Sequence, residues 1–115
     1  MPRLPKKMKI AFPQINVVNN PPYRNHVPVI FRSRGWDHVC LSVFTSGGVR
    51  VGLLDVPAGP GAQWYTVRVD ITATVNPADT CTLYVCPLTT AQTCNPTSPP
   101  TAAQCKRRTV RVYRP

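Results

Sequence analysis

The side chains best suited to chemistry in this chain are basic, and they gather toward its two ends. Residues 1–34 carry seven Lys and Arg, residues 106–115 carry five more, and neither segment contains an acid. The stretch 35–105 between them has two Arg and four Asp, so segments of +7 and +5 enclose one of −2. Ten of the fourteen basic residues are Arg, whose planar fork binds phosphate and carboxylate groups through paired hydrogen bonds. This pattern predicts contact with a nucleic acid or with an acidic protein surface.

The basic residues expected to meet that partner lie in free arms or loops at the two ends, apart from Lys9, which opens a predicted strand. They are Arg3, Lys6, Lys7, Lys9, Lys106, Arg107 and Arg108. Arg111 falls within an alternating strand pattern, so part of the C-terminal charge belongs to a sheet face. Because this set is small, it favours contacts between neighbouring subunits, or shallow contacts with phosphate, over a dedicated binding groove. Solubility and protection of sheet edges are a third explanation of the same charge.

The residues that would mark an enzyme are sparse. The sequence has no Glu, no G-x-S-x-G, no P-loop and no H-E-x-x-H motif, and its four Asp are scattered. Asp37 and His38 are strand neighbours that point to opposite faces, which makes them a poor acid–base pair. His38 and Cys40 share a face but lack a third, orienting group. We therefore expect no enzymatic activity, no catalytic residue and no cofactor.

The five cysteines indicate mainly reduced thiols. They are Cys40, Cys81, Cys86, Cys94 and Cys105. An odd number without a secretory signal predicts small buried side chains and at most one labile pair, with one or two disulfides as the alternative. Cys94 and Cys105 flank a Pro- and Thr-rich segment and are the pair expected to lie close together. The spacing lacks the short paired knuckles of a zinc site, so no metal is predicted.

Composition and periodicity predict an all-β fold. Val and Thr suit pleated sheets, and fourteen prolines oppose helices. The clearest alternation covers 63–75 and predicts a long, half-buried antiparallel strand. Segments 38–44 and 49–56, joined by Ser46-Gly47-Gly48, predict a hairpin with Val49, Val51 and Leu53 on one face. Further strands are expected at 9–18, 27–31, 80–86 and 109–113.

These strands predict one antiparallel β-sandwich with about six to eight strands, either Ig-like or a small jelly roll, with extended basic termini. Residues 1–9 would form a basic N-terminal arm, and residues 10–115 the sandwich domain. Residues 87–105 would be a Thr/Pro-rich surface loop, long enough to serve assembly. No run approaches the ~20 apolar residues of a membrane helix, and no apolar stretch follows the basic N-terminus as a secretory signal requires. We expect neither a membrane span nor classical secretion.

The chain resembles small viral coat and cement (capsid-stabilising) proteins in four features: a basic arm, a β-sandwich body, Thr/Pro-rich loops and the absence of a set of catalytic residues. In such proteins the arms contact the genome or tie neighbouring subunits together. The resemblance implies a non-enzymatic structural role in a virion made in the host cytoplasm, and it assigns no functional residue. The expected partners are copies of this chain or other shell subunits, with nucleic acid at the basic ends and no small-molecule substrate.

Two alternatives to this structural role stay open. The first is a sequence-independent nucleic-acid-binding module, in which the basic ends drive the binding and nearby aromatic residues such as Trp36 stack on bases. The second is a secreted, disulfide-stapled toxin or inhibitor. The missing signal and the odd cysteine count weigh against that second alternative.

Overall fold

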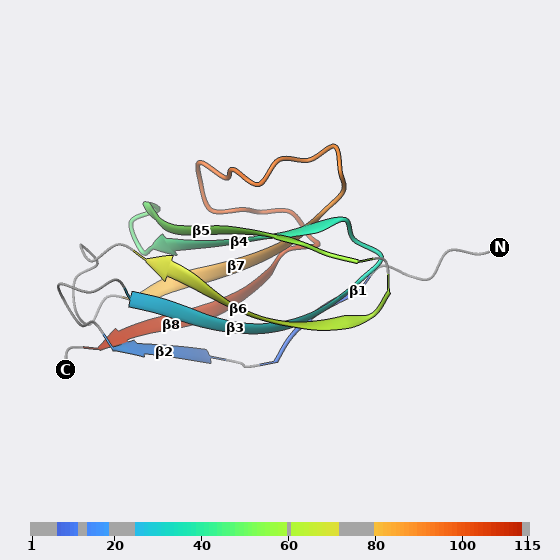
Figure 1. Cartoon of the computed structure of the whole chain (residues 1–115). Coiled ribbons are helices and arrows are strands. Elements are labelled where there is room, and N and C mark those ends of the chain that lie inside the picture. Colours follow the sequence, from blue (N-terminus) through green and yellow to red (C-terminus); the bar gives the residue numbers. More distant parts are fainter. Residues whose placement is uncertain (1–6, 12–13, 19–24, 60, 72–79, 114–115) are drawn as a thin grey trace.

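A computed structural model describes residues 7–11, 14–18, 25–59, 61–71 and 80–113 of the chain. These residues form eight strands and no helix (Figure 1). The strands are β1 (Lys7–Ile10), β2 (Gln14–Val18), β3 (Asn25–Arg34), β4 (His38–Thr45), β5 (Arg50–Pro57), β6 (Gln63–Ile71), β7 (Thr80–Leu88) and β8 (Lys106–Tyr113). The prediction of an all-β fold is confirmed.

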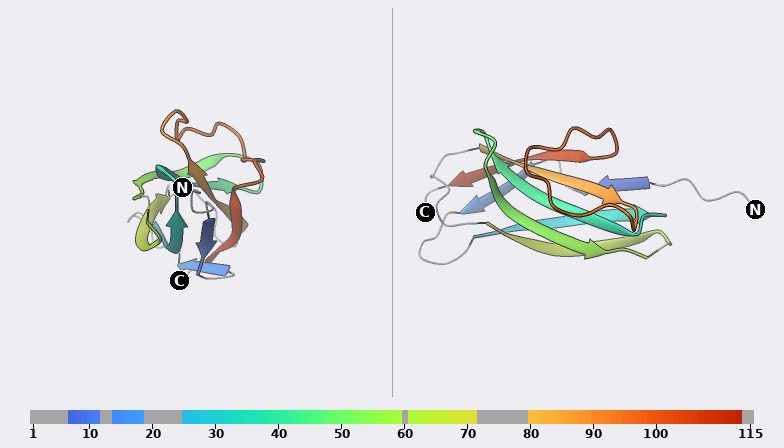
Figure 2. Two further views of the ribbon diagram at one scale, coloured as in Figure 1. Left: turned by 90° about the vertical axis from the view of Figure 1, so that its right-hand side faces the viewer. Right: turned by 90° about the horizontal axis from the view of Figure 1, so that it is seen from above.

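The strands build two sheets that pack face to face as a β-sandwich (Figure 2). One sheet has the order β1-β3-β6 and the other the order β2-β8-β7-β4-β5. The strands β1-β3-β6 and β8-β7-β4-β5 correspond in order to A-B-E and G-F-C-C′ of immunoglobulin-like sandwiches, with β2 as an additional edge strand beside β8, so the Ig-like alternative describes the connectivity better than the jelly roll. The strands pair antiparallel except β2, which runs parallel to β8, an exception that the sequence pattern did not predict.

The single strand predicted at 9–18 is instead two strands in different sheets. β1 pairs with the end of β3, whereas β2 pairs with β8, so the chain changes sheets between residues 10 and 14. Pro13 falls in this connection and has no N–H for a sheet ladder. β1 begins at Lys7, which shortens the predicted arm of residues 1–9, and residues 1–6 lie outside the described part of the chain.

The space between the sheets holds the main core. Its fully buried side chains include Val27, Val29 and Phe31 from β3 and Val39, Leu41, Val43, Leu83, Val85 and Val110 from the opposite sheet. The alternation predicted for 63–75 is confirmed through β6, where Val69 and Ile71 are buried and Trp64 is exposed; residues 72–75 lie outside the described residues.

The predicted hairpin of β4 and β5 is confirmed, but the prediction that Val49, Val51 and Leu53 share one face is wrong. Gly48 adopts a φ of 83° in the turn, which an L side chain rarely tolerates. The register then shifts between Val43 and Phe44, so the alternation of β5 changes phase. Val51 is buried, but Leu53 is 37% exposed, and Leu54 and Val56 pack on the core in its place.

The segment 89–105 covers the outer face of the larger sheet, so β4 and β7 are buried on both sides (Figures 1 and 2). Beneath it lies a second apolar cluster, which we call the outer cluster. Its buried members are Cys40, Phe44, Tyr84, Cys86 and Leu88. The rings of Phe44 and Tyr84 meet edge to face with centroids 5.7 Å apart. The predicted surface loop is therefore a covering layer that shields apolar side chains from water.

Two disulfides hold this segment to the sheet, and they overturn the predicted pairing. Cys94 bonds to Cys40 and Cys105 bonds to Cys86, so the expected Cys94–Cys105 disulfide is wrong, as is the expectation of mainly reduced thiols. Cys40 and Cys86 are cross-strand partners on the outer face of β4 and β7. Each of them bonds to one cysteine of the segment. The segment is therefore attached to the sheet at two points and is not closed into a loop by a disulfide of its own. Cys81 is buried in the main core and belongs to no disulfide.

Candidate functional site

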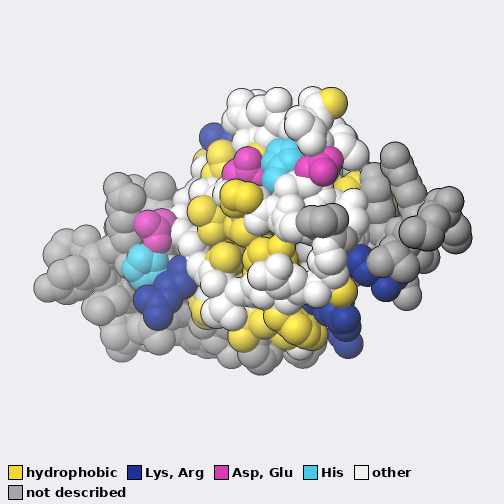
Figure 3. All heavy atoms as spheres, turned by 45° about the vertical axis from the view of Figure 1, so that its right-hand side comes forward, with side chains coloured by type: hydrophobic (Ala, Val, Ile, Leu, Met, Phe, Trp, Pro, Cys, Tyr) yellow, Lys and Arg dark blue, Asp and Glu magenta, His cyan; other side chains and the backbone are white. Residues whose placement is uncertain are grey.

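A pocket of about 460 Å³ opens at the end of the sandwich where β1 and β8 begin and β3 and β7 end. Four basic residues line it: Lys9, Arg32, Arg34 and Lys106. None of its lining residues is acidic. Figure 3 shows Lys and Arg side chains at this end of the molecule and a second basic group at the opposite end, beside a His and an acidic side chain. Residues from both basic segments of the sequence thus line one concave site.

Strand pairing brings these cations together. Lys9 lies directly opposite Arg32 in the β1–β3 ladder, and Arg34 follows two residues later, at the end of β3. Lys106 opens β8 opposite Val85, which is a core residue on the inner face of β7. Lys106 therefore belongs to the inner face of its sheet and approaches the pocket from the side opposite to β1 and β3.

A buried serine and an apolar wall also border the pocket. Ser33 is fully buried, and its Oγ has no hydrogen-bond partner among the described residues. Met8, Trp36 and Pro87 supply apolar surface. Trp36 follows Gly35, whose φ of 77° lets the chain turn sharply between β3 and β4. The site can therefore contact both an anionic group and a flat apolar one.

A second basic surface lies on the outer face of the three-stranded sheet; we call it the basic face (Lys9, Arg32, Trp64 and Arg68). Lys9, Arg32 and Trp64 are successive register partners across β1, β3 and β6. Arg68 lies on the same side of β6 as Trp64, four residues further on. Trp64 is 49% exposed. An exposed indole beside guanidinium groups is a surface suited to stacking and phosphate contact.

The predicted binding residues separate into three groups. Lys9 and Lys106 both line the pocket, as described. Arg107 is exposed on the outer face opposite Tyr84, and the side chain of Arg108 donates a 2.7 Å hydrogen bond to the carbonyl oxygen of Arg107. Lys7 stands opposite Arg34 in the ladder. Arg3 and Lys6 lie outside the described residues.

Residues 106–108 are part of β8 and not of a loop or free arm, so that expectation is wrong. Their backbone pairs with β7 regardless of side-chain charge, and alternate side chains then point to opposite faces. Sequence reasoning also missed Arg32, Arg34 and Ser33 as site residues. The spacing of Arg32 and Arg34 placed both on one strand face, but their proximity to Lys106 depends on how the two sheets pack.

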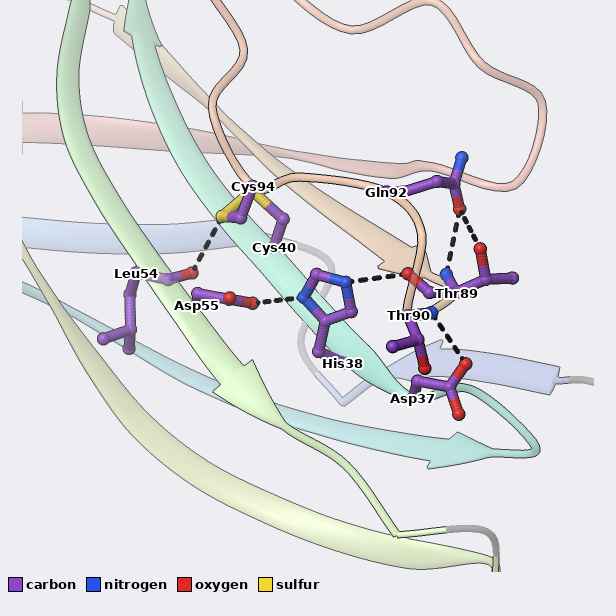
Figure 4. A network of polar contacts seen from close by, with 9 residues as sticks. All are labelled: Asp37, His38, Cys40, Leu54, Asp55, Thr89, Thr90, Gln92 and Cys94. Atoms are coloured by element: carbon purple, nitrogen blue, oxygen red, sulfur yellow. Dashed lines mark hydrogen bonds and ion pairs between the residues drawn. A yellow bond between two sulfur atoms is a disulfide. The ribbon is translucent and has the colours of Figure 1, made fainter.

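A polar network holds the first residues of the covering segment 89–105 to β4 and β5 (Figure 4). His38 contacts Asp55 through Nδ1 at 2.7 Å and the carbonyl oxygen of Thr89 through Nε2 at 2.9 Å. Both partners are acceptors, so only the doubly protonated ring satisfies both contacts. Accordingly, the hydrogen bond to Asp55 raises the pKa of His38, with the Thr89 carbonyl assisting. The Thr90 amide donates to Asp37 at 2.8 Å.

The network leaves no group poised for proton transfer or nucleophilic attack. Both ring nitrogens of His38 are engaged, and the sulfur of Cys40 is bound in a disulfide, so neither member of the His38–Cys40 pair has a free reactive atom. Sγ of Cys94 also lies 3.8 Å from the carbonyl oxygen of Leu54. A disulfide sulfur carries no proton, so this is a contact and not a hydrogen bond. The arrangement anchors the segment.

In the part of the chain that the structure describes, no three His, Cys, Asp or Glu side chains are grouped to hold a metal ion. The same residues include no helix long and apolar enough to cross a membrane. Comparison of the chain with protein-family models, curated proteins and solved structures found no match.

Proposed function

We propose that this protein is a non-enzymatic structural protein of a virus particle or a similar assembly, either a small capsid protein or a capsid-stabilising one. It would contact an anionic partner, a neighbouring subunit or the genome, through the basic face. The observation that carries the proposal is the imbalance between the charges of the described residues. Asp37, Asp55 and Asp70 each have a local partner, namely the Thr90 amide, His38 and His26. Lys9, Arg32 and Arg68 form no ion pair with any described residue and remain available to a partner.

The rest of the architecture supports the same role. The described residues build a rigid two-layer body whose outer face is covered and cross-linked by two disulfides. Strands β1 and β6 form the edges of the three-stranded sheet, and Lys9 and Arg68 of the basic face lie on these two strands. Such edges can pair with a strand of a neighbouring subunit, while the cations contact its acidic residues.

Assembly is tested by electron microscopy and sedimentation of the native source material and of the purified full chain. We expect the protein in a particle or filament fraction, or in an assembly with a second shell component. Protein that stays monomeric at high concentration, and that is absent from every particle fraction, would refute the structural role. Charge-reversal of Arg32 and Arg68 to Glu should release the protein from particles, whereas Arg111→Glu, an exposed residue of β8 in the other sheet, should not.

The basic face favours a second candidate, a sequence-independent nucleic-acid-binding module. Trp64 can stack on an unpaired base while Lys9 and Arg32 bind the flanking phosphates, and one stacked base is worth about 1–3 kcal/mol. Trp64→Ala should therefore weaken binding of oligo-dT by about 5- to 150-fold in fluorescence anisotropy at low salt. Arg32→Gln should reduce the salt dependence of that binding, and Arg111→Gln serves as the charge-matched control. Absence of binding to single- and double-stranded polymers at low salt would exclude this candidate.

A further inference from the structure

We infer that the four cysteines of the outer face form one coupled redox site. A thiol reductant that opens either disulfide there leads to a third disulfide, Cys40–Cys86, and frees Cys94 from the sheet. The inference goes beyond the structural role and does not depend on assembly. It rests on three features: the register of the cysteines, the burial of two of them beneath segment 89–105, and the apolar surface that this segment covers.

Strand register places three of the cysteines in one row. Cys40 of β4 is the register partner of Cys86 of β7. Cys105 immediately precedes β8, whose first residue, Lys106, pairs with Val85, the neighbour of Cys86. Directly opposed residues of antiparallel strands have Cα atoms about 4.5–5.5 Å apart, which lies within the range of about 4.4–6.8 Å that a disulfide spans. Cys86 therefore has a possible partner on each side, Cys105 on one and Cys40 on the other.

Exposure decides which sulfur atoms a reductant attacks first. Cys40 and Cys86 are buried beneath the segment, whereas Cys94 and Cys105 are only partly buried. An external thiolate therefore attacks a sulfur of the segment, and the buried sulfur on the sheet is the leaving group. Each attack thus produces a thiolate on the sheet, beside the disulfide that is still intact.

The exchange balances in atoms and electrons. The reductant is a small dithiol or two monothiols; one of its thiolates bonds to the sulfur of Cys94, and the Cys40–Cys94 bond breaks to leave a thiolate on Cys40. That thiolate attacks Cys86, the Cys40–Cys86 bond forms, and Cys105 leaves as a thiolate that takes a proton from water. The second thiol group of the reductant then releases Cys94. The reductant is oxidised to its disulfide, and the protein gains two electrons and two protons.

Two properties of the outer cluster favour this product. The exchange moves the negative charge from buried Cys40 to partly exposed Cys105, where water solvates it. Ser42 also lies on this face, between Cys40 and Phe44 in β4, and its buried Oγ has no hydrogen-bond partner among the described residues. A buried hydroxyl without a partner costs free energy, which water recovers when the cover is lifted.

The product holds the segment less firmly but keeps the sheet cross-linked. Without the Cys40–Cys94 bond, the middle of the segment is still held by hydrogen bonds from Arg50 to Asn95 and Pro96, which are exposed to water. The segment can then lift from the aromatic and aliphatic side chains of the outer cluster, while Cys40–Cys86 joins β4 to β7. Reduction therefore exposes an apolar surface without unfolding the sandwich.

The experiment is limited reduction of the oxidised full chain with an equimolar amount of dithiothreitol, an acid quench, alkylation after denaturation, and peptide mapping under non-reducing conditions. We expect the major species with a single disulfide to contain Cys40–Cys86, with Cys81, Cys94 and Cys105 alkylated. Independent disulfides would instead leave species with Cys40–Cys94 or with Cys86–Cys105. Absence of the Cys40–Cys86 peptide would overturn the inference.

Matched variants test the role of the attacking sulfur without any reductant. Cys94→Ser leaves a permanent thiol on Cys40 beside the Cys86–Cys105 disulfide, so the Cys40–Cys86 peptide should form spontaneously. Cys40→Ser removes the same disulfide but lacks that sulfur, so it should retain Cys86–Cys105. Retention of Cys86–Cys105 in both variants would overturn the exchange, and its loss in both would show scrambling that does not depend on register. Cys81→Ala should behave like the wild type, because Cys81 lies in the main core.

Hydrogen exchange tests whether the cover is released. Residues 89–105 should exchange at least about 10-fold faster in the half-reduced protein than in the oxidised protein, whereas β3 and β6 should be unchanged. Equal rates in the segment would contradict its release, and faster exchange throughout would mean that the sandwich itself unfolds. Assembly is measured by sedimentation and not by peptide mapping, so each of the two proposals can fail while the other stands.

Discussion

Removal of the two disulfides one at a time tests how the covering segment is held. Cys40–Cys94 closes a loop with a sequence separation of 54 residues, and Cys86–Cys105 closes one of 19. In the chain-entropy account, a cross-link stabilises by restricting the unfolded chain, more so for a longer loop, which gives about 4 kcal/mol for the first disulfide and about 3 kcal/mol for the second. We expect the double variants Cys40→Ala/Cys94→Ala and Cys86→Ala/Cys105→Ala to lose stability in that order.

Packing adds to this entropic loss. Cys40 and Cys86 are 3% and 6% exposed and lie in the outer cluster beneath segment 89–105. When either cross-link is absent, the segment can separate from the sheet more easily and expose Phe44 and Tyr84 to water. Cys81→Ala is the control, because Cys81 is buried but not cross-linked, so its loss should cost only its own packing, about 1 kcal/mol.

The assay is urea denaturation, supported by thiol counting and peptide mapping under non-reducing conditions. The oxidised protein should show one reactive thiol after denaturation, Cys81, and mapping should recover Cys40 linked to Cys94. A Cys94–Cys105 linked peptide, or five thiols in the denatured native protein, would refute the pairing. Unchanged stability in both double variants would refute the claim that the segment contributes to the fold.

Two further predictions concern pH and close packing. The Asp55 contact raises the pKa of His38 above its unfolded value of about 6.5. The stability that this contact adds is therefore fully present below about pH 6.5 and is lost as pH rises through the folded pKa. The difference in urea stability between the wild type and His38→Gln should accordingly shrink as pH is raised from about 5.5 to 8.5. Gly52→Ala should lower the free energy of unfolding by about 1–3 kcal/mol, because a Cβ there would lie 2.9 Å from the backbone oxygen of Asp70. Gly61→Ala is the control: open space surrounds that position, so its thermal unfolding should be unchanged.

Opposite outcomes would contradict these two arguments. If the His38→Gln difference stayed constant across the pH range, the imidazolium would not be the source of the stability. If Gly52→Ala melted like Gly61→Ala, the close approach of β5 to β6 would not be a constraint on the sandwich.

Local patterns in the sequence were enough to predict the strands of the sandwich. The alternation in β6, the glycine turn between β4 and β5, and the abundance of Val, Thr and Pro each depend on backbone preferences that act over a few residues. The same patterns failed where non-local pairing decides the result. The register shift beside Phe44 put Leu53 on a different face from Val51, and a change of sheet divided the first predicted strand.

The cysteines illustrate the limit of spacing arguments. Cys94 and Cys105 are close in sequence, and a surface loop closed by them was a reasonable expectation. The sheet instead places Cys40 next to Cys86 across β4 and β7, and the apolar outer face of those strands requires a cover. Burial of Phe44, Tyr84 and Leu88 draws the segment down onto the sheet, where each of its cysteines meets a different strand.

The candidate site also has properties that local sequence predicts and properties that depend on non-local packing. The sequence by itself determined that the chain carries two basic segments around a nearly neutral middle, that it forms strands, and that it lacks the common catalytic motifs, because these properties depend on residue type and local order. Only the tertiary structure decided that Lys9 and Lys106, 97 positions apart, line one pocket with Arg32, Arg34 and Ser33. That proximity arises from the pairing of β1 with β3, of β8 with β7, and from the packing of the two sheets, which is set by burial of a core drawn from the whole chain.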